Sequence, residues 1–397
     1  MRIVLIADTF PPHRTSGAVQ LRDLAREFVR QGHNLTVLLP SSGQREPWLL
    51  EDFDEVQVLR LKAPRTKDVG YVRRTLGELF MPFSMLLQLR KSPLANEGWE
   101  GVVWYAPSIF HAPLARALKN ASGCKGYLII RDIFPDWAVD MGLMKRGLPY
   151  LFFDMVARYQ YSVADIIGVQ TPGNRNYFDC WQQQPGRQLE ILQNWLDTPA
   201  AAPCSIQVNE TYLKGRKIFV YAGNMGVAQG MDILLDLADK LYRRSDVGFL
   251  FVGRGSEVSR LRAAAQKRQL DNVMFFEEIH PDEIPGLYAQ CSAGIVVLDP
   301  RHKSHNIPGK FLTYMQSGLP VLASVNRGND LAQLIRDERV GQVCESNRVD
   351  ELLFLAEELL TQLEGNTAAF SVRCKGLFER EFSVKKAVGQ IVAALSS

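Results

Sequence analysis

The 397-residue sequence has no long apolar run, no closely paired cysteines and almost no excess of one charge sign. No apolar run approaches the roughly 18 residues that a membrane-spanning helix needs, and no signal-peptide pattern precedes the first apolar stretch. The six cysteines form no C-x-x-C pair and lack metal-ligand spacing, which favours free thiols in a reducing compartment. The net charge of +3 argues against a nucleic-acid-binding protein. We therefore expect a cytoplasmic protein, free or held at the inner face of the plasma membrane, that binds no nucleic acid.

Short apolar strands alternate with amphipathic helices along the whole chain, a pattern typical of parallel α/β sheets. The chain is too long for one ordinary core, so two domains of roughly 190 residues each are expected. In the first half we predict strands at 3–7, 35–39, 56–60, 101–104, 127–130, 166–169 and 190–192, with helices at 16–31, 110–120 and 150–164. In the second half we predict strands at 217–223, 248–252, 273–276, 293–297, 320–323 and 341–343.

Residues 197–203 are small, contain proline and show no periodicity, which is typical of an interdomain linker. We predict a Rossmann-like domain over residues 1–197, a second one over residues 198–382, and a terminal helix over residues 383–397 that crosses back to the first domain. Doubly wound sheets bind ligands outside the carboxyl ends of their strands. We therefore expect an α/β protein whose two domains face a central cleft.

Two loops that follow strands have features of anion sites. Gly17 opens a helix after a loop stiffened by two prolines, so amide groups at the helix start can face an anion, although such a glycine can also simply turn the chain. Gly223, Asn224, Met225 and Gly226 follow the first strand of the second domain, where the backbone can approach a diphosphate closely. No acidic residue ends the next strand, which disfavours a nicotinamide cofactor.

Cationic residues gather in the loops after two further strands of the second domain. Pro308 suits the first turn of a helix, so the amides of Gly309 and Lys310 should point outward and form a phosphate site. A purely solvated charged loop is the alternative for this segment. Arg254 lies between two glycines at a strand end, where it can face a phosphate or form a surface salt bridge.

With these blocks the sequence resembles the retaining glycosyltransferases of family 4. The resemblance rests on PGKFLTYMQSGLPV at 308–321, on FPP at 10–12 before Gly17 and on GRG at 253–255, and it covers essentially the whole chain. It implies the GT-B fold, a nucleotide-sugar donor, and no metal or other cofactor. The donor-binding residues that it suggests are Gly17, Gly223, Asn224, Met225, Gly226, Arg254, Glu278, Asn306, Ile307, Pro308, Gly309, Lys310 and Thr313.

The sequence departs from the family at three positions. The family typically has two glutamates eight positions apart, the first for the donor sugar and the second for the ribose, and this chain has His305 and Thr313 there. Both can form hydrogen bonds with hydroxyl groups, but neither carries a carboxylate. Gln229 replaces the usual lysine after the glycine loop, so Arg254 or Lys310 has to supply the positive charge for the diphosphate.

In the first domain, Arg131 and Asp132 follow a strand at the place where the family often has a histidine. Arg131, Asp132 and His111 are the candidate acceptor-binding residues, although Asp132 can equally cap the following turn. The candidate catalytic residues are Asp132, His305, Lys310 and Arg254. Because no enzymic nucleophile is evident, the resemblance implies front-face attack, in which the leaving phosphate takes the acceptor's proton.

The segments HNIPGK at 305–310 and NMGVAQ at 224–229 are similar to those of a subgroup of the family that acts in O-antigen and capsule biosynthesis. That subgroup transfers N-acetylated amino-deoxyhexoses of the fucosamine or quinovosamine kind, so the resemblance implies a UDP-sugar donor and a saccharide acceptor linked to polyprenyl diphosphate. Two alternatives share the fold: a nucleotide-sugar 2-epimerase, and a non-catalytic partner subunit.

Residues 71–91 have apolar side chains at helical spacing, with paired cations at each end. Such a helix can lie in the interface of an anionic membrane, or it can cover the first sheet as an ordinary amphipathic helix. Pro82 is expected to kink this helix or to split it.

Overall fold

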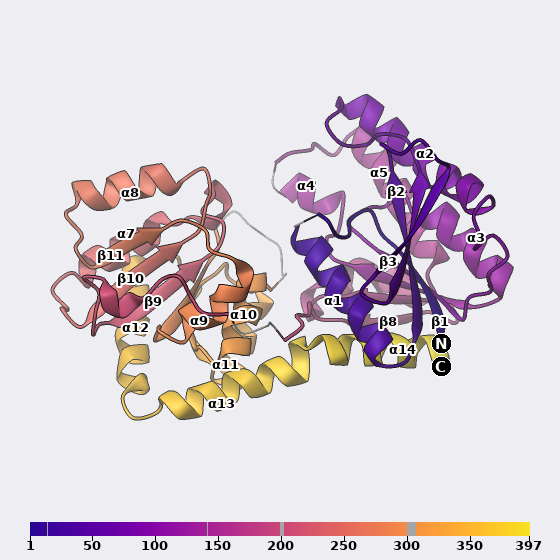
Figure 1. Cartoon of the computed structure of the whole chain (residues 1–397). Helices are drawn as coiled ribbons and strands as arrows, with labels where there is room; N and C mark the ends of the chain where they lie inside the picture. Colours follow the sequence, from indigo (N-terminus) through magenta and orange to yellow (C-terminus); the bar gives the residue numbers. More distant parts are fainter. Residues whose placement is uncertain (14, 141, 199–201, 300–306) are drawn as a thin grey trace. The chain divides into compact units, whose positions relative to one another are not determined.

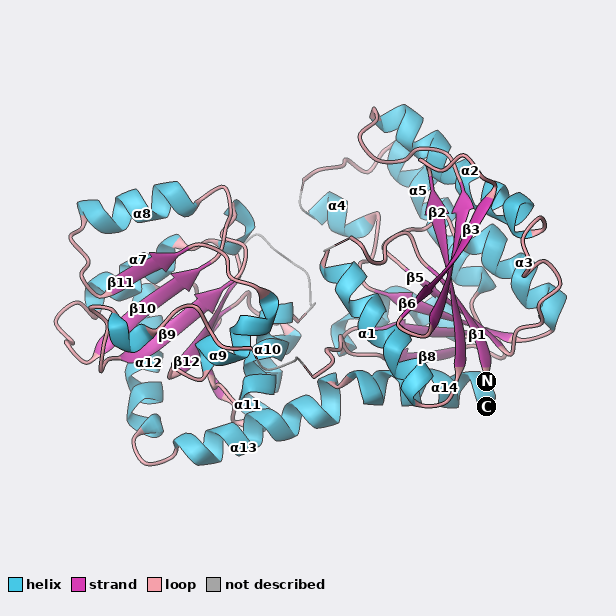
Figure 2. Ribbon diagram, viewed as in Figure 1, coloured by secondary structure: helices cyan, strands magenta, loops and turns pink. Residues whose placement is uncertain are grey.

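The structure, a computed structural model, describes residues 1–397 except 14, 141, 199–201 and 300–306. The chain forms two compact units: unit 1 contains Met1–Asp197 and Val384–Ser397, and unit 2 contains Thr198–Ser383 (Figure 1). Each unit is built on one sheet with helices on both faces (Figure 2). The predicted α/β fold with two Rossmann-like domains is confirmed.

Unit 1 contains an eight-stranded sheet in the order β3-β4-β2-β1-β5-β6-β7-β8. Among the described strands of this sheet only β3 is antiparallel to its neighbour, β4. The strands are β1 (Arg2–Ile6), β2 (Asn34–Ser41), β3 (Trp48–Phe53), β4 (Val56–Lys62), β5 (Gly101–Tyr105), β6 (Lys125–Ile130), β7 (Ile166–Val169) and β8 (Gln188–Ile191).

Two helical layers cover the sheet of unit 1. Alternate side chains of β1 face opposite layers, as the two-residue period of a strand requires: Val4 and Ile6 pack with α2, α3 and α5, whereas Ile3 and Leu5 pack with α1 and α14. Burial of each such aliphatic side chain contributes about 1.5–3 kcal/mol. The helices are α1 (Ser16–Arg30), α2 (Tyr71–Leu89), α3 (Ala112–Ser122), α4 (Asp136–Asp140), α5 (Leu148–Val163), α6 (Asp179–Gln182) and α14 (Val384–Ser396).

The C-terminal helix α14 belongs to unit 1, although the chain reaches it from unit 2. Val388 and Ile391 are buried in the core beside α1, and the Gln390 side-chain amide donates to the Ile191 carbonyl oxygen at 2.9 Å. Gly101 of β5 leaves room for this helix, because a Cβ there would lie 2.7 Å from Leu395 Cδ1.

Unit 2 contains a six-stranded parallel sheet in the order β11-β10-β9-β12-β13-β14. Ala293 and Ile295 pack on the face covered by α7, α8 and α12, whereas Gly294 faces the Tyr314 ring of α10 on the opposite side. The strands are β9 (Lys217–Ala222), β10 (Val247–Val252), β11 (Val273–Phe276), β12 (Ala293–Val297), β13 (Val321–Ser324) and β14 (Gly341–Cys344). The helices are α7 (Asp232–Lys240), α8 (Val258–Lys267), α9 (Ile284–Tyr288), α10 (Gly309–Ser317), α11 (Asp330–Glu338), α12 (Val349–Leu363) and α13 (Thr367–Leu377).

The strand order places a topological switch point in each sheet. In unit 1 the chain moves from β1 to β2 and β4 and then returns to β5 on the other side of β1. In unit 2 it moves from β9 to β10 and β11 and then returns to β12 on the other side of β9. Crossovers diverge at such points, so the loops after β1, β5, β9 and β12 are where ligands of doubly wound sheets bind.

The structure differs from the sequence-based prediction in two places. Strand β3 was not predicted, because its residues are only half-buried or exposed at the sheet edge and so lack a clear apolar pattern. Helix α2 runs unbroken through Pro82, so the expected split does not occur. Among the described residues, no helix is long and apolar enough to cross a membrane.

Candidate functional site

A half-buried lysine lies at the switch point of unit 2. Lys310 occupies the first turn of α10, two residues after the N-cap residue Pro308. Its Nζ atom lies 3.7 Å from the centroid of the Tyr221 ring at the end of β9. Burial lowers the pKa of the Lys310 ammonium group to about 7, and no described carboxylate offsets this effect. The helix start and this cation together form a site that gains from a bound anion.

The loops after β9 and β10 meet backbone to backbone, and glycine makes this approach feasible. A Cβ at Gly253 would lie 2.0 Å from the Gly223 carbonyl oxygen, and one at Gly255 would lie 2.2 Å from that of Met225. Both glycines also have positive φ angles, 143° and 150°. The Met225 amide donates to the Arg254 carbonyl oxygen at 2.8 Å. The two loops are therefore fixed relative to each other within unit 2.

The remaining residues of the glycine loop present backbone rather than side chains. The Met225 side chain is fully buried, whereas Gly223 and Asn224 are exposed. The Gly226 amide donates to Gln229 Oε1 at 3.0 Å. Gln229, which stands where the resembled family has a lysine, thus stabilises the turn itself.

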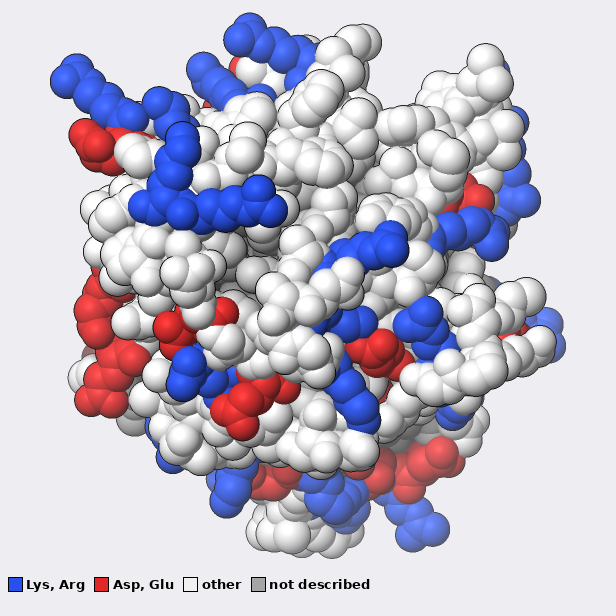
Figure 3. All heavy atoms as spheres, turned by 90° about the vertical axis from the view of Figure 1, so that its right-hand side faces the viewer, with Lys and Arg blue, Asp and Glu red and all other residues white. Residues whose placement is uncertain are grey.

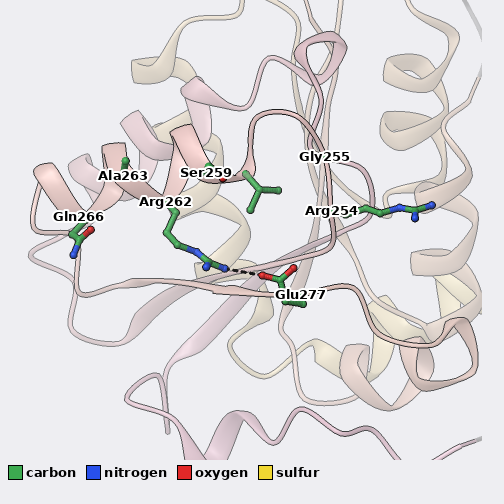
Figure 4. Close-up of a pocket in the computed structure, with 8 residues that line it drawn as sticks. Arg254, Gly255, Ser259, Arg262, Ala263, Gln266 and Glu277 are labelled. Carbon is green, nitrogen blue, oxygen red and sulfur yellow. Dashed lines mark hydrogen bonds and ion pairs between the residues drawn. The ribbon is translucent and has the colours of Figure 1, made fainter.

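Arg254 extends from the loop after β10 and lies largely in solvent. It forms an ion pair with Glu278 at 3.3 Å, and both side chains are exposed. A pocket of about 450 Å³ lies beside α8, where Arg262 pairs with Glu277 at 3.4 Å. Figure 4 shows the Arg254 side chain pointing away from that pair. Because this ion pair is exposed and therefore weak, Arg254 can exchange it for a ligand at the carboxyl edge of the sheet.

The predicted donor residues of α10 are placed as follows. Ile307 is buried, and Gly309 is exposed at the start of the helix. The Thr313 hydroxyl donates to the Lys310 carbonyl oxygen at 2.9 Å, within the helix. His305 and Asn306 lie outside the described residues. Their predicted roles, like that of Thr313 toward a ribose, stay predictions.

A second polar cluster lies at the switch point of unit 1, around the start of α1. Arg131 donates to the Gln20 side-chain oxygen, to the Tyr105 hydroxyl at 2.9 Å and to the Ser16 hydroxyl at 3.1 Å. Burial raises the pKa of Tyr105 to about 12, with the Arg131 charge opposing the shift. A guanidinium group beside a helix N-terminus adds positive charge to the positive end of the dipole, so this place also favours an anion.

Gly17 allows the close contacts at the start of that helix. A Cβ at Gly17 would lie 3.3 Å from Thr9 Cγ2. Thr15 is the N-cap, and its hydroxyl accepts from the Ala18 amide at 3.3 Å and lies 3.1 Å from the Thr9 hydroxyl. The glycine therefore has a packing role, whatever it contributes to a ligand.

Two carboxylates and a histidine accompany this cluster. The charges of Asp132 and Asp8 both raise the pKa of Tyr105, which places them near its hydroxyl. His111 is fully buried, and within the described part of the chain neither ring nitrogen has a hydrogen-bond partner. Burial lowers its pKa to about 4, with the Asp8 charge opposing. An acceptor can contact the His111 ring only if its surroundings rearrange.

The fold brings into these clusters two residues, Tyr221 and Asp8, that were not predicted from the sequence. Tyr221 ends an apolar strand, so the sequence gives it only a core role, and its contact with Lys310 depends on tertiary structure. Asp8 lies two residues after the buried strand β1, and this position at a carboxyl edge is a sequence signal that could have identified it. Within the described ranges, no group of three or more His, Cys, Asp or Glu residues is arranged to hold a metal ion.

Comparisons with known proteins agree with this architecture. Residues 216–362 match the family described as glycosyl transferases group 1. The chain is 23% identical to the probable glycosyltransferase WbjE of Pseudomonas aeruginosa, covering 90% of this chain and 89% of that protein. It is 24% identical to the putative colanic acid biosynthesis glycosyl transferase WcaI of Escherichia coli, covering 93% and 94%. The structure of Anabaena HepE in complex with UDP and glucose has a TM-score of 0.67 at 15% identity and covers 99% of both chains. Residues 216–362 therefore form a group 1 glycosyltransferase domain, and the protein is a glycosyltransferase with the GT-B fold.

Proposed function

We propose that the protein transfers a sugar from a UDP-sugar to a saccharide linked to polyprenyl diphosphate, with retention of configuration, in the biosynthesis of a bacterial surface polysaccharide. The observation that carries the proposal is Lys310: a half-buried lysine without a described carboxylate partner, at a helix start beside a glycine loop. A diphosphate supplies the missing negative charge. HepE, a structural neighbour, is known in complex with UDP.

The proposed chemistry needs no enzymic nucleophile. The bond between the sugar's anomeric carbon and the β-phosphate oxygen breaks, and the acceptor hydroxyl attacks the same face. The leaving phosphate takes the proton of that hydroxyl. The protein's contribution is to position the reactants and to stabilise the charge that develops on the diphosphate, with Lys310, Arg254 and the first amides of α10 as the groups for this role. We propose that no metal ion is required, because these groups can balance the charge.

The acceptor is assigned to unit 1. Arg131, which contacts Ser16 at the start of α1, offers an anion site for the acceptor. The diphosphate of a polyprenyl-linked acceptor carries the negative charge that this site can bind. Asp132, one residue further along, can hold the attacking hydroxyl as a hydrogen-bond acceptor. The surface-polysaccharide context comes from the relatives: WcaI is described as a colanic acid enzyme. The donor sugar is proposed to be an N-acetylated amino-deoxyhexose, with His305 as its candidate contact, Asn306 as a further donor-binding residue and Thr313 as the candidate contact of the ribose.

We further propose that unit 1 binds the anionic inner face of the plasma membrane. One face of α2 packs on the sheet through Met81, Met85 and Leu89, and the other presents apolar side chains to solvent. The exposed apolar side chains of α2 are Tyr71, Val72, Leu76, Phe80, Phe83 and Leu87, and those of α5 include Leu148, Leu151 and Met155. On the side shown in Figure 3, lysine and arginine predominate near the top, at the height of α2, whereas both charge signs mix below.

The test combines binding and turnover. Thermal-shift measurements should show that UDP stabilises the protein more than UMP does, because the second phosphate is the group that Lys310 contacts. Incubation with candidate UDP-sugars and bacterial membranes should then yield UDP together with an extended lipid-linked saccharide. Equal shifts with UDP and UMP would contradict the donor site, and release of free sugar without acceptor would favour an epimerase instead.

A further inference from the structure

Unit 1 contains a pocket to which neither the proposed donor site nor the proposed acceptor residues belong. It has a volume of about 440 Å³ and begins at Ile133, directly after Asp132. Helices α4 and α5, the 3-10 helix at Pro172–Phe178 and α6 form its walls. Its volume lies within the range of roughly 300–1,000 Å³ that is usual for small-molecule sites. The pocket therefore continues along unit 1 from the candidate acceptor residue.

The two carboxylates of this pocket have polar or charged neighbours. Asp136 accepts a hydrogen bond from the Tyr150 hydroxyl at 3.0 Å and lies 3.8 Å from the Arg146 guanidinium group. Asp154 pairs with Arg158 at 2.7 Å. The lining thus carries two carboxylates and one arginine, with the exposed Arg146 beside it, so the pocket offers hydrogen-bond acceptors and no excess of positive charge that would attract an anion. Such a lining suits a polar, uncharged ligand.

Aromatic side chains provide the rest of the lining. Phe134, Tyr150, Tyr161 and Tyr177 all face the pocket. The Tyr161 ring is held edge-on against Phe178, with centroids 4.9 Å apart. Burial raises the pKa of Tyr161, so its hydroxyl stays protonated at neutral pH. Tyr161 is half-buried, and its hydroxyl forms no hydrogen bond with any described residue, so the hydroxyl is available to a ligand as a donor and an acceptor.

From this arrangement we infer that the pocket holds one neutral sugar residue of the acceptor saccharide. A pyranose has apolar C–H faces that pack on aromatic rings, and hydroxyl groups that pair with carboxylates and phenols. Tyr161 and Asp136 serve as hydrogen-bonding partners, and Tyr150 and Tyr177 as packing surfaces. The inference rests on the proposed function, because the sugar held here belongs to the molecule whose hydroxyl lies at Asp132.

Saturation-transfer difference NMR can test this pocket with the folded full-length chain. The probes are the methyl glycosides of glucose, galactose, N-acetylglucosamine and N-acetylgalactosamine, with the methyl glycoside of glucuronic acid as a charged comparison. Excess UDP fills the donor site throughout. At least one neutral glycoside should receive saturation from aromatic protons and bind more tightly than the glucuronide.

The decisive variant is Tyr161→Phe, which removes only the unpartnered hydroxyl. It should weaken binding of that glycoside about five- to tenfold, on the scale of one hydrogen bond. The matched control is Tyr159→Phe, on the same helix but outside the pocket, which should bind as the wild type does. Asp136→Asn should weaken binding as well.

Three outcomes would overturn the inference: no neutral glycoside binds, the glucuronide binds best, or Tyr161→Phe binds as tightly as the wild type. A normal UDP-induced thermal shift in the same samples would limit that failure to this pocket. Loss of the UDP shift in the wild type would instead contradict the proposed function.

Discussion

The Lys310 ammonium group lies 3.7 Å from the centre of the Tyr221 ring. This contact is attractive, because the face of an aromatic ring is electronegative. It does not fully offset burial, which lowers the pKa of Lys310 to about 7. Without a ligand, the Lys310 amine is therefore only partly protonated at neutral pH. A charged Lys310 favours anion binding, but its desolvated charge destabilises the ligand-free protein.

Replacing this lysine should have opposite effects on UDP binding and on the stability of the ligand-free protein. Lys310→Met should abolish the thermal shift caused by UDP and lower turnover by about 10²-fold or more, the scale for loss of one charge-stabilising donor. The ligand-free variant should unfold at the same temperature as the wild type or above it, because methionine is buried without a charge penalty. Differential scanning fluorimetry and a UDP-release assay measure both effects. Lys267→Met, an exposed lysine on α8, is the control and should change neither.

The stability of the ligand-free protein should depend on pH through the same residue. The folded pKa of Lys310 lies below its ordinary value of 10.5, so the unfolded state binds more protons between about pH 7 and 10.5. The Lys310 contribution to stability therefore rises with pH in this window, while the affinity for UDP falls as pH rises above about 7. Thermal unfolding of the ligand-free proteins from pH 6 to 9 should show this rise in stability in the wild type relative to Lys310→Met, and calorimetric titrations of the wild type should show the fall in UDP affinity. A parallel pH dependence in the two proteins would show that Lys310 does not carry it.

The fold was predictable because its signals are local. Apolar strands such as Ala293–Val297 alternate with amphipathic helices, and residues 166–169, 273–276 and 293–297 were predicted with the bounds that the structure has. The strand at Trp48–Phe53 was missed, since an edge strand with mixed burial has no distinct period. Local pattern thus gives the apolar strands, including β11 at the edge of its sheet, and fails at β3, where the apolar run is interrupted by acidic residues.

The candidate sites were only partly predictable, because they depend on which loops meet. The cationic loop, the glycine turns and Arg131 could be identified from position after a strand. The Lys310–Tyr221 contact depends on tertiary packing. So does the burial of the His111 ring, whose nitrogens have no hydrogen-bond partner among the described residues. Neither feature can be recognised from a short motif. The aromatic pocket at Tyr161 joins α5 to helices after β7, so its residues are scattered in the sequence.

Arg254 should contribute to transfer without contributing to folding. Arg254→Ala should lower turnover by about 10²-fold, because the Gln229 substitution leaves few cations for the diphosphate. Its ion pair with Glu278 is exposed, so the melting temperature should stay unchanged. The matched control is Arg262→Ala, which breaks the similar exposed pair with Glu277 beside α8. If turnover drops equally in both variants, or by less than about threefold in Arg254→Ala, the diphosphate lies elsewhere.

Transfer activity should persist in excess EDTA. Lys310, Arg254 and the first amides of α10 are proposed to balance the charge of the leaving diphosphate, a task that other enzymes give to a metal ion. The assay follows UDP release before and after dialysis against the chelator, with heat-treated protein as the blank. Loss of activity that magnesium or manganese restores would contradict this proposal.

Membrane binding should depend on the exposed face of α2 and on the cations at its ends. Anionic lipid head groups attract each nearby lysine or arginine by about 1 kcal/mol. The protein should therefore co-sediment with anionic liposomes, only weakly with neutral ones, and less as salt rises. Arg73→Glu with Arg74→Glu should weaken sedimentation. Arg243→Glu with Lys267→Glu, an equal charge change at exposed positions of unit 2, should leave it unchanged apart from the small effect of net charge.

The apolar side of α2 separates membrane binding from core packing. Phe80 and Phe83 are 58% and 50% exposed, so Phe80→Ser with Phe83→Ser should abolish sedimentation and leave the melting temperature within a few degrees of the wild type. Met85 lies on the opposite, fully buried face, and Met85→Asp should unfold unit 1, because an unpaired charge would enter the core. If the double serine variant unfolds as well, its side chains belong to the core. If it stays folded and still sediments, the lipid contact lies on another surface.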